Sequence, residues 1–232
     1  MKKTSLYVLF AMSVLLAASC TNAPKSDEAA TSEAKEVSES GGSETLTIDT
    51  AMSNVEWIGT KVSGYHTGTI DISEGTLDVK DGAITGGKFK LNMNSLNVLG
   101  PAGSDQAMNA KLTGHLKSPD FFDATNFPEG TFEITSVKPF TGTVAEENDE
   151  RQADISEYKV ANPTHTISGN LTLKGVTKNI EFPAKITVSE NSAEAIAKFN
   201  IDRSLWNIVY PGKPDDLIRN EVHLGIALKA NM

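Results

Sequence analysis

The residues best suited to chemistry are four histidines, His66, His115, His165 and His223, and a single cysteine, Cys20. No two histidines stand at the i, i+4 spacing that puts two zinc ligands on one helical face, and there is no second thiol. A metal site built from His66, His115 and His165 is therefore a weak alternative to ordinary hydrogen bonding by these side chains. We expect neither a bound metal nor another cofactor.

The sequence also lacks the motifs of common enzymes. It contains no nucleophile elbow, phosphate-binding loop or dinucleotide fingerprint, and its carboxylates show no signature of a catalytic pair. The acidic run 146–150 lacks the spacing of a calcium loop and belongs to a solvated stretch from Gly142 to Asn162. We therefore predict a protein that is not an enzyme; lipid processing with His66 or His115 as acid or base is the less favoured alternative.

The residues before Cys20 indicate its role. Residues 1–19 begin with Lys2 and Lys3, continue as an apolar run and end in small residues, which is typical of a secretory signal peptide. The segment 16–20 resembles the processing site of bacterial lipoproteins, in which the cysteine is acylated and becomes the new N-terminus. We predict a lipid-attached Cys20 on a lipoprotein of the bacterial cell envelope, on the periplasmic side or the surface; an ordinary cleaved signal is the alternative.

Residues 20–44 are predicted to form a disordered linker between this anchor and the domain. They are rich in Ser, Ala, Glu and Thr and contain no aromatic residue, so they cannot bury enough apolar surface to offset the cost of ordering. A flexible linker of this length reaches roughly 25–30 Å, so the domain would float near the membrane. The chain has a net charge of −9 and no basic patch, which excludes nucleic acid as a partner.

Residues 45–232 alternate apolar and polar side chains with a period of two in nearly every segment, as antiparallel strands with one solvated face do. About eight strands are expected, and those near 83–94, 176–188 and 219–230 are about a dozen residues long. Long strands with short turns favour a closed cylinder over a sandwich. We predict an all-β fold with a short helical insert, in the form of an eight-stranded antiparallel up-and-down barrel. Pro183 should cause a bulge or a missing ladder bond.

The segment 104–134 breaks this alternation. Ser104 is a good N-cap, and an apolar stripe follows it at four-residue steps. The run 118–120, Ser-Pro-Asp, repeats the signal for a helix start. Two interpretations stay open: a lid over the open end of the barrel, or a helix that covers a sheet edge. The stripe consists of Met108, Leu112 and Leu116.

Four motifs, in this order along the chain, resemble the YceI-like family of polyisoprenoid-binding lipoproteins and periplasmic proteins. The resemblance covers residues 46–232 and implies a lipocalin-like barrel whose elongated apolar cavity holds a long isoprenoid or another amphiphilic lipid. It implies carriage or storage of that lipid by a membrane-tethered lipoprotein, and it allows a homodimer. A non-catalytic interaction lipoprotein with a filled barrel is the alternative. The motifs are 55–61 with 64–68, 114–123 with 127–128, 168–178, and 201–208.

Under this hypothesis, the inward aromatic and aliphatic residues should contact the lipid. An eight-stranded barrel has room for its side chains or for one small ligand, so the pattern alone leaves a ligand-filled lumen and a fully packed core as equal alternatives. The predicted ligand contacts are Trp57, Ile72, Phe89, Leu91, Met93, Phe121, Phe122, Phe132, Ile134, Ile167, Leu171, Phe182, Phe199 and Leu224.

A polar head group would lie at the mouth of the barrel, near His66, His115, Arg203, Trp206 or Tyr210. Arg203 is the preferred contact for an anionic head, because a guanidinium matches phosphate oxygens; an ion pair with Asp202 or another acid is the alternative. His223 alternates with inward residues and is expected to face solvent.

Overall fold

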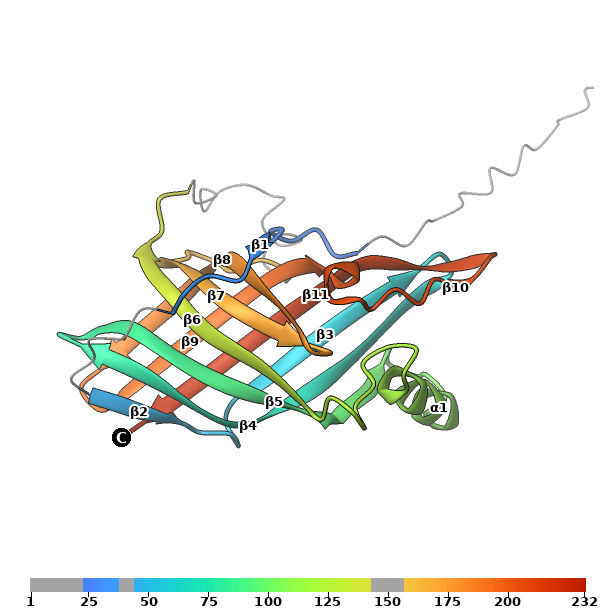
Figure 1. The fold of residues 1–232 in the computed structure, drawn as a ribbon, viewed down its shortest axis with the longest axis horizontal. Helices are drawn as coiled ribbons and strands as arrows, with labels where there is room; N and C mark the ends of the chain where they lie inside the picture. The colour runs from blue at the N-terminus through green and yellow to red at the C-terminus, as the bar shows by residue number, and fades with distance from the viewer. Residues whose placement is uncertain (1–22, 38–43, 143–156) are drawn as a thin grey trace, which may run out of the picture.

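Figure 1 shows the computed structural model of the chain, which describes residues 23–37, 44–142 and 157–232. The predicted signal peptide, Cys20 and the acidic run 146–150 lie outside the described residues. Within the described part, eight antiparallel strands close into a barrel, as predicted. They are β3 (Asn54–Lys61), β4 (Gly64–Lys80), β5 (Ala83–Gly100), β6 (Glu129–Pro139), β7 (His165–Leu173), β8 (Val176–Ser189), β9 (Ser192–Asp202) and β11 (Asp216–Asn231).

The strands follow one another around the barrel in chain order, and β11 completes the circle by pairing with both β9 and β3. The short strand β2 (Glu44–Ile48) occupies the same position as β3 at the far end, because it too pairs with β4 and β11. A second short strand, β10 (Gly212–Lys213), forms a hairpin with the start of β11. The inward residues of all eight barrel strands form one apolar core, which explains the alternation in the sequence.

The helical insert is a single helix, α1 (Gln106–Lys117), at one end of the barrel (Figure 1). Its N-cap is Asp105 rather than Ser104: the Asp105 carboxylate accepts hydrogen bonds from the amides of Ala107 and Met108, at 2.7 and 3.1 Å. Among the described residues, no helix has the length and apolar character needed to cross a bilayer. Because the barrel is closed, α1 has no barrel edge to cover, and the lid interpretation fits its position.

The prediction of a second helical start at residue 118 is wrong. Ser118 caps the end of α1, and the chain then turns back so that the amides of Phe121 and Asp123 both bond to the Ser118 carbonyl. Asp123 has a left-handed backbone, with φ of 48°, which a helix does not tolerate. These turns direct Phe121, now buried, toward the barrel.

The prediction of a disordered linker is wrong for residues 23–37, which we call the N-terminal strap. This segment lies along the outside of the barrel and forms β1 (Ala30–Glu33), which pairs with residues 178–181 of β8. Polar contacts hold it: the Asn200 amide nitrogen donates to the Pro24 carbonyl at 3.0 Å, and Asn170 bonds both backbone groups of Lys35. Composition alone underestimates how ordered such a segment is, because hydrogen bonds to the barrel hold it in place of apolar burial.

The strap completes the barrel wall where β8 and β9 separate. β8 pairs with β9 only from Ala184 to Ser189, and β1 takes over as its partner at Glu181. On the β9 side, the Ala29 amide donates to the Asn200 carbonyl at 2.9 Å. Pro183, which lacks an N–H, keeps its register with β7 and lies between the ladders of β8 with β1 and with β9, so the prediction holds as a missing ladder pairing and not as a bulge.

His223 is another residue for which the prediction was wrong: it faces outward, yet the structure buries it to 4% exposure. Its Nδ1 lies 3.0 Å from the side-chain oxygen of Asn200, and Tyr158 packs edge-on against its ring. The Asn200 nitrogen already donates to Pro24 and Glu28, so Asn200 accepts and Nδ1 of His223 carries the proton. Burial, and to a lesser degree Lys198, lower the pKa of His223 to about 4.

This burial predicts an acid-sensitive fold. In the unfolded chain, His223 takes up a proton below its ordinary pKa of about 6.5, whereas in the folded chain it stays neutral down to about pH 4. The free energy of unfolding should therefore fall by roughly 1–3 kcal/mol between pH 7 and pH 4 through this residue. Urea titrations across this range, compared with His223→Gln, measure the effect. An unchanged pH slope in the variant would contradict the assignment.

Candidate ligand-binding site

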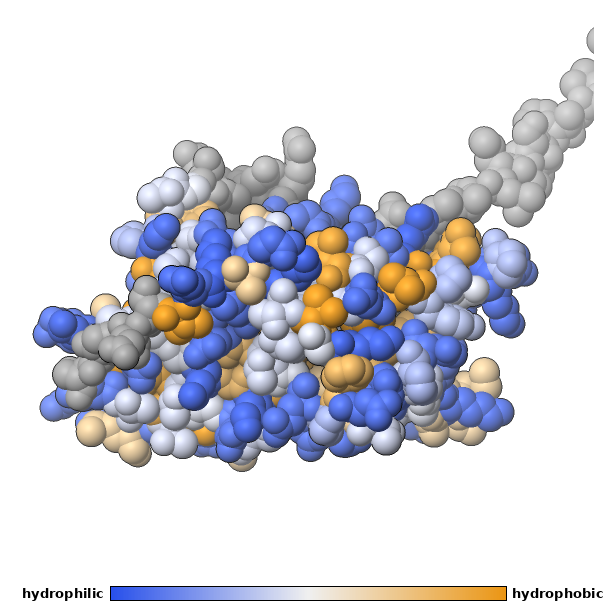
Figure 2. All heavy atoms as spheres, in the orientation of Figure 1, coloured by the Kyte–Doolittle hydropathy of each residue, from blue (hydrophilic) through white to orange (hydrophobic). Residues whose placement is uncertain are grey.

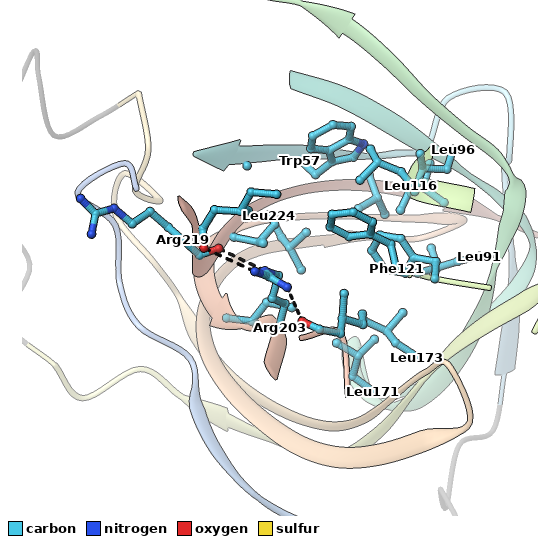
Figure 3. Close-up of a pocket in the computed structure, with 18 residues that line it drawn as sticks. Trp57, Leu91, Leu96, Leu116, Phe121, Leu171, Leu173, Arg203, Arg219 and Leu224 are labelled. Carbon is cyan, nitrogen blue, oxygen red and sulfur yellow. Dashed lines mark hydrogen bonds between the residues drawn. The ribbon is translucent and has the colours of Figure 1, made fainter. Parts of the chain in front are cut away.

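The half of the barrel near α1 contains an apolar cavity of about 110 Å³, which we call the mouth-side cavity (Figure 3). Figure 3 shows Trp57, Leu116 and Phe121 around its opening and the leucines of several strands around its floor. Six of the predicted ligand contacts line it. They are Trp57, Leu91, Phe121, Phe122, Leu171 and Leu224.

A second, smaller cavity of about 50 Å³ lies in the other half of the barrel, and we call it the distal cavity. Its lining is also almost wholly apolar, with Lys88 as the one charged residue. Five further predicted contacts line it. They are Phe89, Phe132, Ile134, Ile167 and Phe182.

An aromatic belt, formed by Phe89, Phe132, Phe182 and Phe199, crosses the lumen between the two cavities. Successive ring centroids are 5.4, 5.8 and 4.1 Å apart, and the rings of Phe182 and Phe199 are stacked. Gly169 makes room for the belt, since a Cβ there would lie 2.2 Å from the Phe132 ring. The three other predicted contacts, Ile72, Met93 and Phe199, are buried but line neither cavity.

Sequence reasoning missed several residues of the mouth-side cavity. Val55 and Ile70 alternate with predicted contacts on the same strands, so the period-two pattern could have identified them. Ile208 and Ile218 lie outside the regular alternation, in the loop after β9 and at the start of β11, and only the folded structure places them.

Above the mouth-side cavity, a larger hollow of about 430 Å³ opens to solvent, and we call it the mouth groove. It lies between α1 and the ends of β3, β4 and β11, and it shares Trp57, Leu116 and Phe121 with the cavity below. Three of the predicted head-group residues line it: His66, His115 and Tyr210. The lining also includes Lys61, Lys111 and Lys213.

One side of the mouth groove is closed by aromatic contacts between α1 and the loop before β10. The His115 ring meets Phe121 and Tyr210 edge-on, with centroids 5.1 and 4.9 Å away. Phe121 and Tyr210 are themselves 5.1 Å apart. His115 also lies 3.1 Å from a carboxylate oxygen of Asp120, so its ring is fixed from both sides.

Unpaired polar atoms gather in this groove. Trp57 Nε1, Thr60 Oγ1 and His66 Nδ1 are buried and have no hydrogen-bond partner in the structure, and all three residues line the groove. A fourth unpaired atom, Nε of Arg219, belongs to a side chain that extends away from the cavity (Figure 3). Buried polar groups normally have hydrogen-bond partners, so these three atoms are the ones in the groove that a polar ligand could bond.

Two shifted pKa values describe the electrostatics of the groove. Burial is the main cause that lowers the pKa of His66, so its ring is neutral at pH 7. Lys61 and the amide and hydroxyl of Ser63 lower the pKa of Asp216 to about 2. The Lys61–Asp216 ion pair, with an N···O distance of 2.5 Å, ties the β3–β4 turn to the β10–β11 hairpin.

The placement of Trp206 at the mouth is wrong. It lies in a short 3₁₀ helix, η1 (Arg203–Trp206), with no exposed surface, and its indole nitrogen donates to the Leu171 carbonyl at 3.0 Å. The sequence analysis placed it among the residues near a polar head group. In the fold, η1 turns it under β8, where it fills the core.

Arg203 was expected to contact an anionic head, with an ion pair to an acid as the alternative, and the structure instead directs its guanidinium at the backbone. Its guanidinium donates to backbone carbonyls of Arg219, Ile208, Tyr210 and Ile218. It lines the mouth-side cavity below the groove and lies 5.9 Å from the Phe121 ring centre (Figure 3). Burial lowers its pKa. Its main role is to fasten the loop after η1 to the start of β11.

The three histidines considered for a metal do not come together as a group of ligands. His66 and His115 share the groove, whereas His165 begins β7 and bonds Thr164. Within residues 23–37, 44–142 and 157–232, no three His, Cys, Asp or Glu side chains are grouped in a way that could hold a metal ion.

Comparison with known proteins agrees with this geometry. The model of the YceI-like domain matches residues 46–230, which is most of the chain. The chain belongs to the YceI-like family. Protein YceI from Salmonella arizonae is 32% identical over 112 residues, so the chain aligns with about half the length of this curated relative and uses about half its own. The region matched by the family model contains every strand of the barrel except the final residue of β11.

Two solved structures show the same fold as this YceI-like chain. Burkholderia cenocepacia BcnA superposes with a TM-score of 0.59 at 18% identity, covering 79% of this chain and 99% of that one. A polyisoprenoid binding domain from Saccharophagus degradans gives a TM-score of 0.54 at 13% identity, covering 80% and 97%. At such identities the likeness concerns the fold alone.

The four carbonyl contacts of Arg203 predict a large stability loss on substitution. Arg203→Met keeps the apolar stem of the side chain but removes all its donors, which should lower the free energy of unfolding by roughly 3 kcal/mol. Arg219→Met is the matched control, because its side chain makes no hydrogen bond that the structure shows and should cost less than about 1 kcal/mol. Urea unfolding measures both, and equal losses would contradict the role given to Arg203.

Proposed function

We propose that this YceI-like protein is a membrane-tethered lipoprotein that binds one long-chain amphiphilic lipid, an isoprenoid or a related chain, for carriage or storage. The observation that carries the proposal is the continuity of an apolar cavity with a groove that holds unpaired polar atoms and lysines. A lipid with an apolar tail and a polar head has the same two parts in the same order. The polyisoprenoid binding domain of Saccharophagus degradans has this fold, which supports the choice of tail.

The chemistry of the groove favours an anionic head. The Trp57 nitrogen can only donate a hydrogen bond, and the three lysines supply positive charge. Phosphate and carboxylate oxygens accept such bonds, and charge-assisted hydrogen bonds are the stronger kind. The tail supplies the larger part of the free energy, since burying ~400 Å² of hydrocarbon contributes about 10 kcal/mol before ordering costs.

The narrow lumen determines how the tail is accommodated. The mouth-side cavity, at about 110 Å³, is smaller than the roughly 300 Å³ of a small ligand pocket. A long chain therefore has to move the aromatic belt and join the two cavities. Phenylalanine side chains can do this by changing rotamer, at a cost that reduces the net affinity.

The same narrow lumen favours a second candidate function, a non-catalytic interaction lipoprotein whose barrel stays filled by its own side chains. The two candidates differ in one measurement. Native mass spectrometry of the full chain, purified from its own host, should show one bound lipid under the first proposal and none under the second. An organic extract of the same sample identifies the lipid.

The tether rests on the sequence of the first 20 residues and is part of the proposal. Acylation at Cys20 would place the protein in the bacterial cell envelope, on the periplasmic side or the surface. The family resemblance also allows a homodimer. Mass spectrometry of the intact chain reads both the acyl mass and the oligomeric state.

Gly59 offers a precise test of the route into the lumen. It lines both the groove and the mouth-side cavity, its φ is not in the left-handed range, and a Cβ there would meet only the Trp57 ring, at 3.7 Å and beyond. Gly59→Leu should therefore fit the fold, block the passage and lower lipid occupancy at least roughly tenfold.

Gly225→Leu is the matched control. Gly225 pairs with Glu56 on the neighbouring strands, and its missing side chain points outward, where a Cβ would lie 3.8 Å from the Glu56 side chain. Occupancy by native mass spectrometry should stay within about twofold of the unmodified chain, since the lumen is unchanged. Equal occupancy in the Gly59 variant would place the ligand outside the barrel.

A further inference from the structure

Four exposed apolar side chains surround the mouth groove, and we call them the apolar rim. They belong to four different segments: the β3–β4 turn, α1, the loop after η1 and the start of β11. Each one lines the groove or adjoins a residue that does. The rim consists of Val62, Met108, Val209 and Leu217, and the last three are 60%, 63% and 49% exposed.

Two segments of the rim are joined by a backbone hydrogen bond. The Val62 amide donates to the Leu217 carbonyl at 3.2 Å, which brings the β3–β4 turn beside the start of β11. In Figure 1, α1 and β10 lie at the same end of the barrel, on opposite sides of its opening. Figure 2 shows hydrophobic and hydrophilic residues intermixed at this end. Single exposed apolar residues are ordinary, but four around the opening of an apolar cavity form a contact surface.

The charge inside the rim is positive, although the chain as a whole has a net charge of −9. Lys61, Lys111 and Lys213 line the groove, and the one acid in its lining, Asp216, is paired with Lys61. In the described part of the chain, the structure shows no ion pair for Lys111 or Lys213. The mouth thus presents positive charge framed by apolar tips, which complements the surface of an anionic bilayer.

The N-terminal strap places the expected anchor at the same end. The Pro24 carbonyl accepts a hydrogen bond from the Asn200 side chain on β9. Asn200 pairs with His223 on β11, and His223 pairs with Ile58 on β3. Ile58 lies three residues before Lys61, which lines the mouth groove. Cys20 precedes Pro24 by four residues, a reach of at most ~14 Å. Asn231, at the far end of β11, lies eight residues beyond His223, or about 26 Å along the strand, so the far end of the barrel is the more distant one.

We propose that the mouth of the barrel docks directly on an anionic lipid bilayer. The apolar rim enters the headgroup layer, and Lys111 and Lys213 contact lipid phosphates. The lipid then passes between bilayer and groove without exposing its tail to water. This inference rests on the proposed function and adds to it the surface through which the ligand is exchanged.

The test uses the full acylated chain in vesicles of phosphatidylcholine, alone or with an equal part of phosphatidylglycerol, that carry a nitroxide on the lipid chains. A fluorescent label is attached in two variants, Val209→Cys at the rim and Met52→Cys at the opposite end of β3. Both residues are 63% exposed, so the labels start from matched accessibility. The label at position 209 should be quenched and the label at position 52 should not; equal quenching, or none at either position, would overturn the proposal.

The charges are tested in the labelled Val209→Cys protein. Lys111→Glu and Lys213→Glu should each weaken quenching in the anionic vesicles by roughly fivefold, as expected for a lysine at a charged membrane surface. Lys80→Glu, at the exposed end of β4 at the far end of the barrel, is the control and should change nothing. Equal effects of all three substitutions would refute a specific contact by the mouth.

Failure of the docking proposal can be told apart from failure of the proposed function. Native mass spectrometry of the same variants reads lipid occupancy independently of quenching. Retained occupancy without preferential quenching at position 209 overturns docking alone, whereas preferential quenching without any bound lipid supports docking and removes the lipid-carrier role. Label uptake by the protein without an introduced cysteine reports whether Cys20 is acylated.

Discussion

The stacking of Phe182 on Phe199, with ring centroids 4.1 Å apart, limits how much the barrel can hold. An eight-stranded barrel has an interior just wide enough for its own side chains or for one slender ligand, so every inward ring removes space from the lumen. The aromatic belt takes that space at the middle of the barrel, and two cavities remain on either side. Any chain longer than the mouth-side cavity competes with these rings for the same volume.

The two ends of the barrel are built differently, and this gives the lumen a direction. At the far end, β2 adds Leu46 and Ile48, both almost fully buried, and Ile48 lies so close to Gly75 that a Cβ there would approach it to 2.7 Å. At the mouth, Trp57 lies flat against Gly68, and Gly59 leaves the passage open. The far end is thus densely packed, whereas glycines leave space at the mouth.

The sequence was informative wherever local pattern decides structure. The alternation of Trp57 with Glu56, or of Phe199 with Lys198, reports which face of a strand is buried, and this was enough to predict the barrel and the interior position of the twelve proposed contacts that lie on strands. Their role in binding is still a prediction. The pattern could not show the belt, because the distance between rings depends on how distant strands meet.

The errors have a common physical cause, which is contact between segments far apart in the chain. His223 does face outward, as its alternation indicates, but Asn200, Tyr158 and the strap cover it. Trp206 is buried because η1 packs under β8. The strap itself has the composition of a disordered linker, and only the asparagines of the barrel surface give it a place to bind.

The strap and the aromatic belt meet at neighbouring residues of β9. Phe199 points into the lumen and stacks on Phe182, while Asn200 points outward and bonds the strap at Pro24 and Glu28. Adjacent residues of a strand face opposite sides but share one backbone, so one short segment of β9 contributes both to the lumen wall and to the binding site of the strap. The four-pair ladder between β1 and β8 and the polar contacts of the strap bury little apolar surface, so this part of the wall costs little to release.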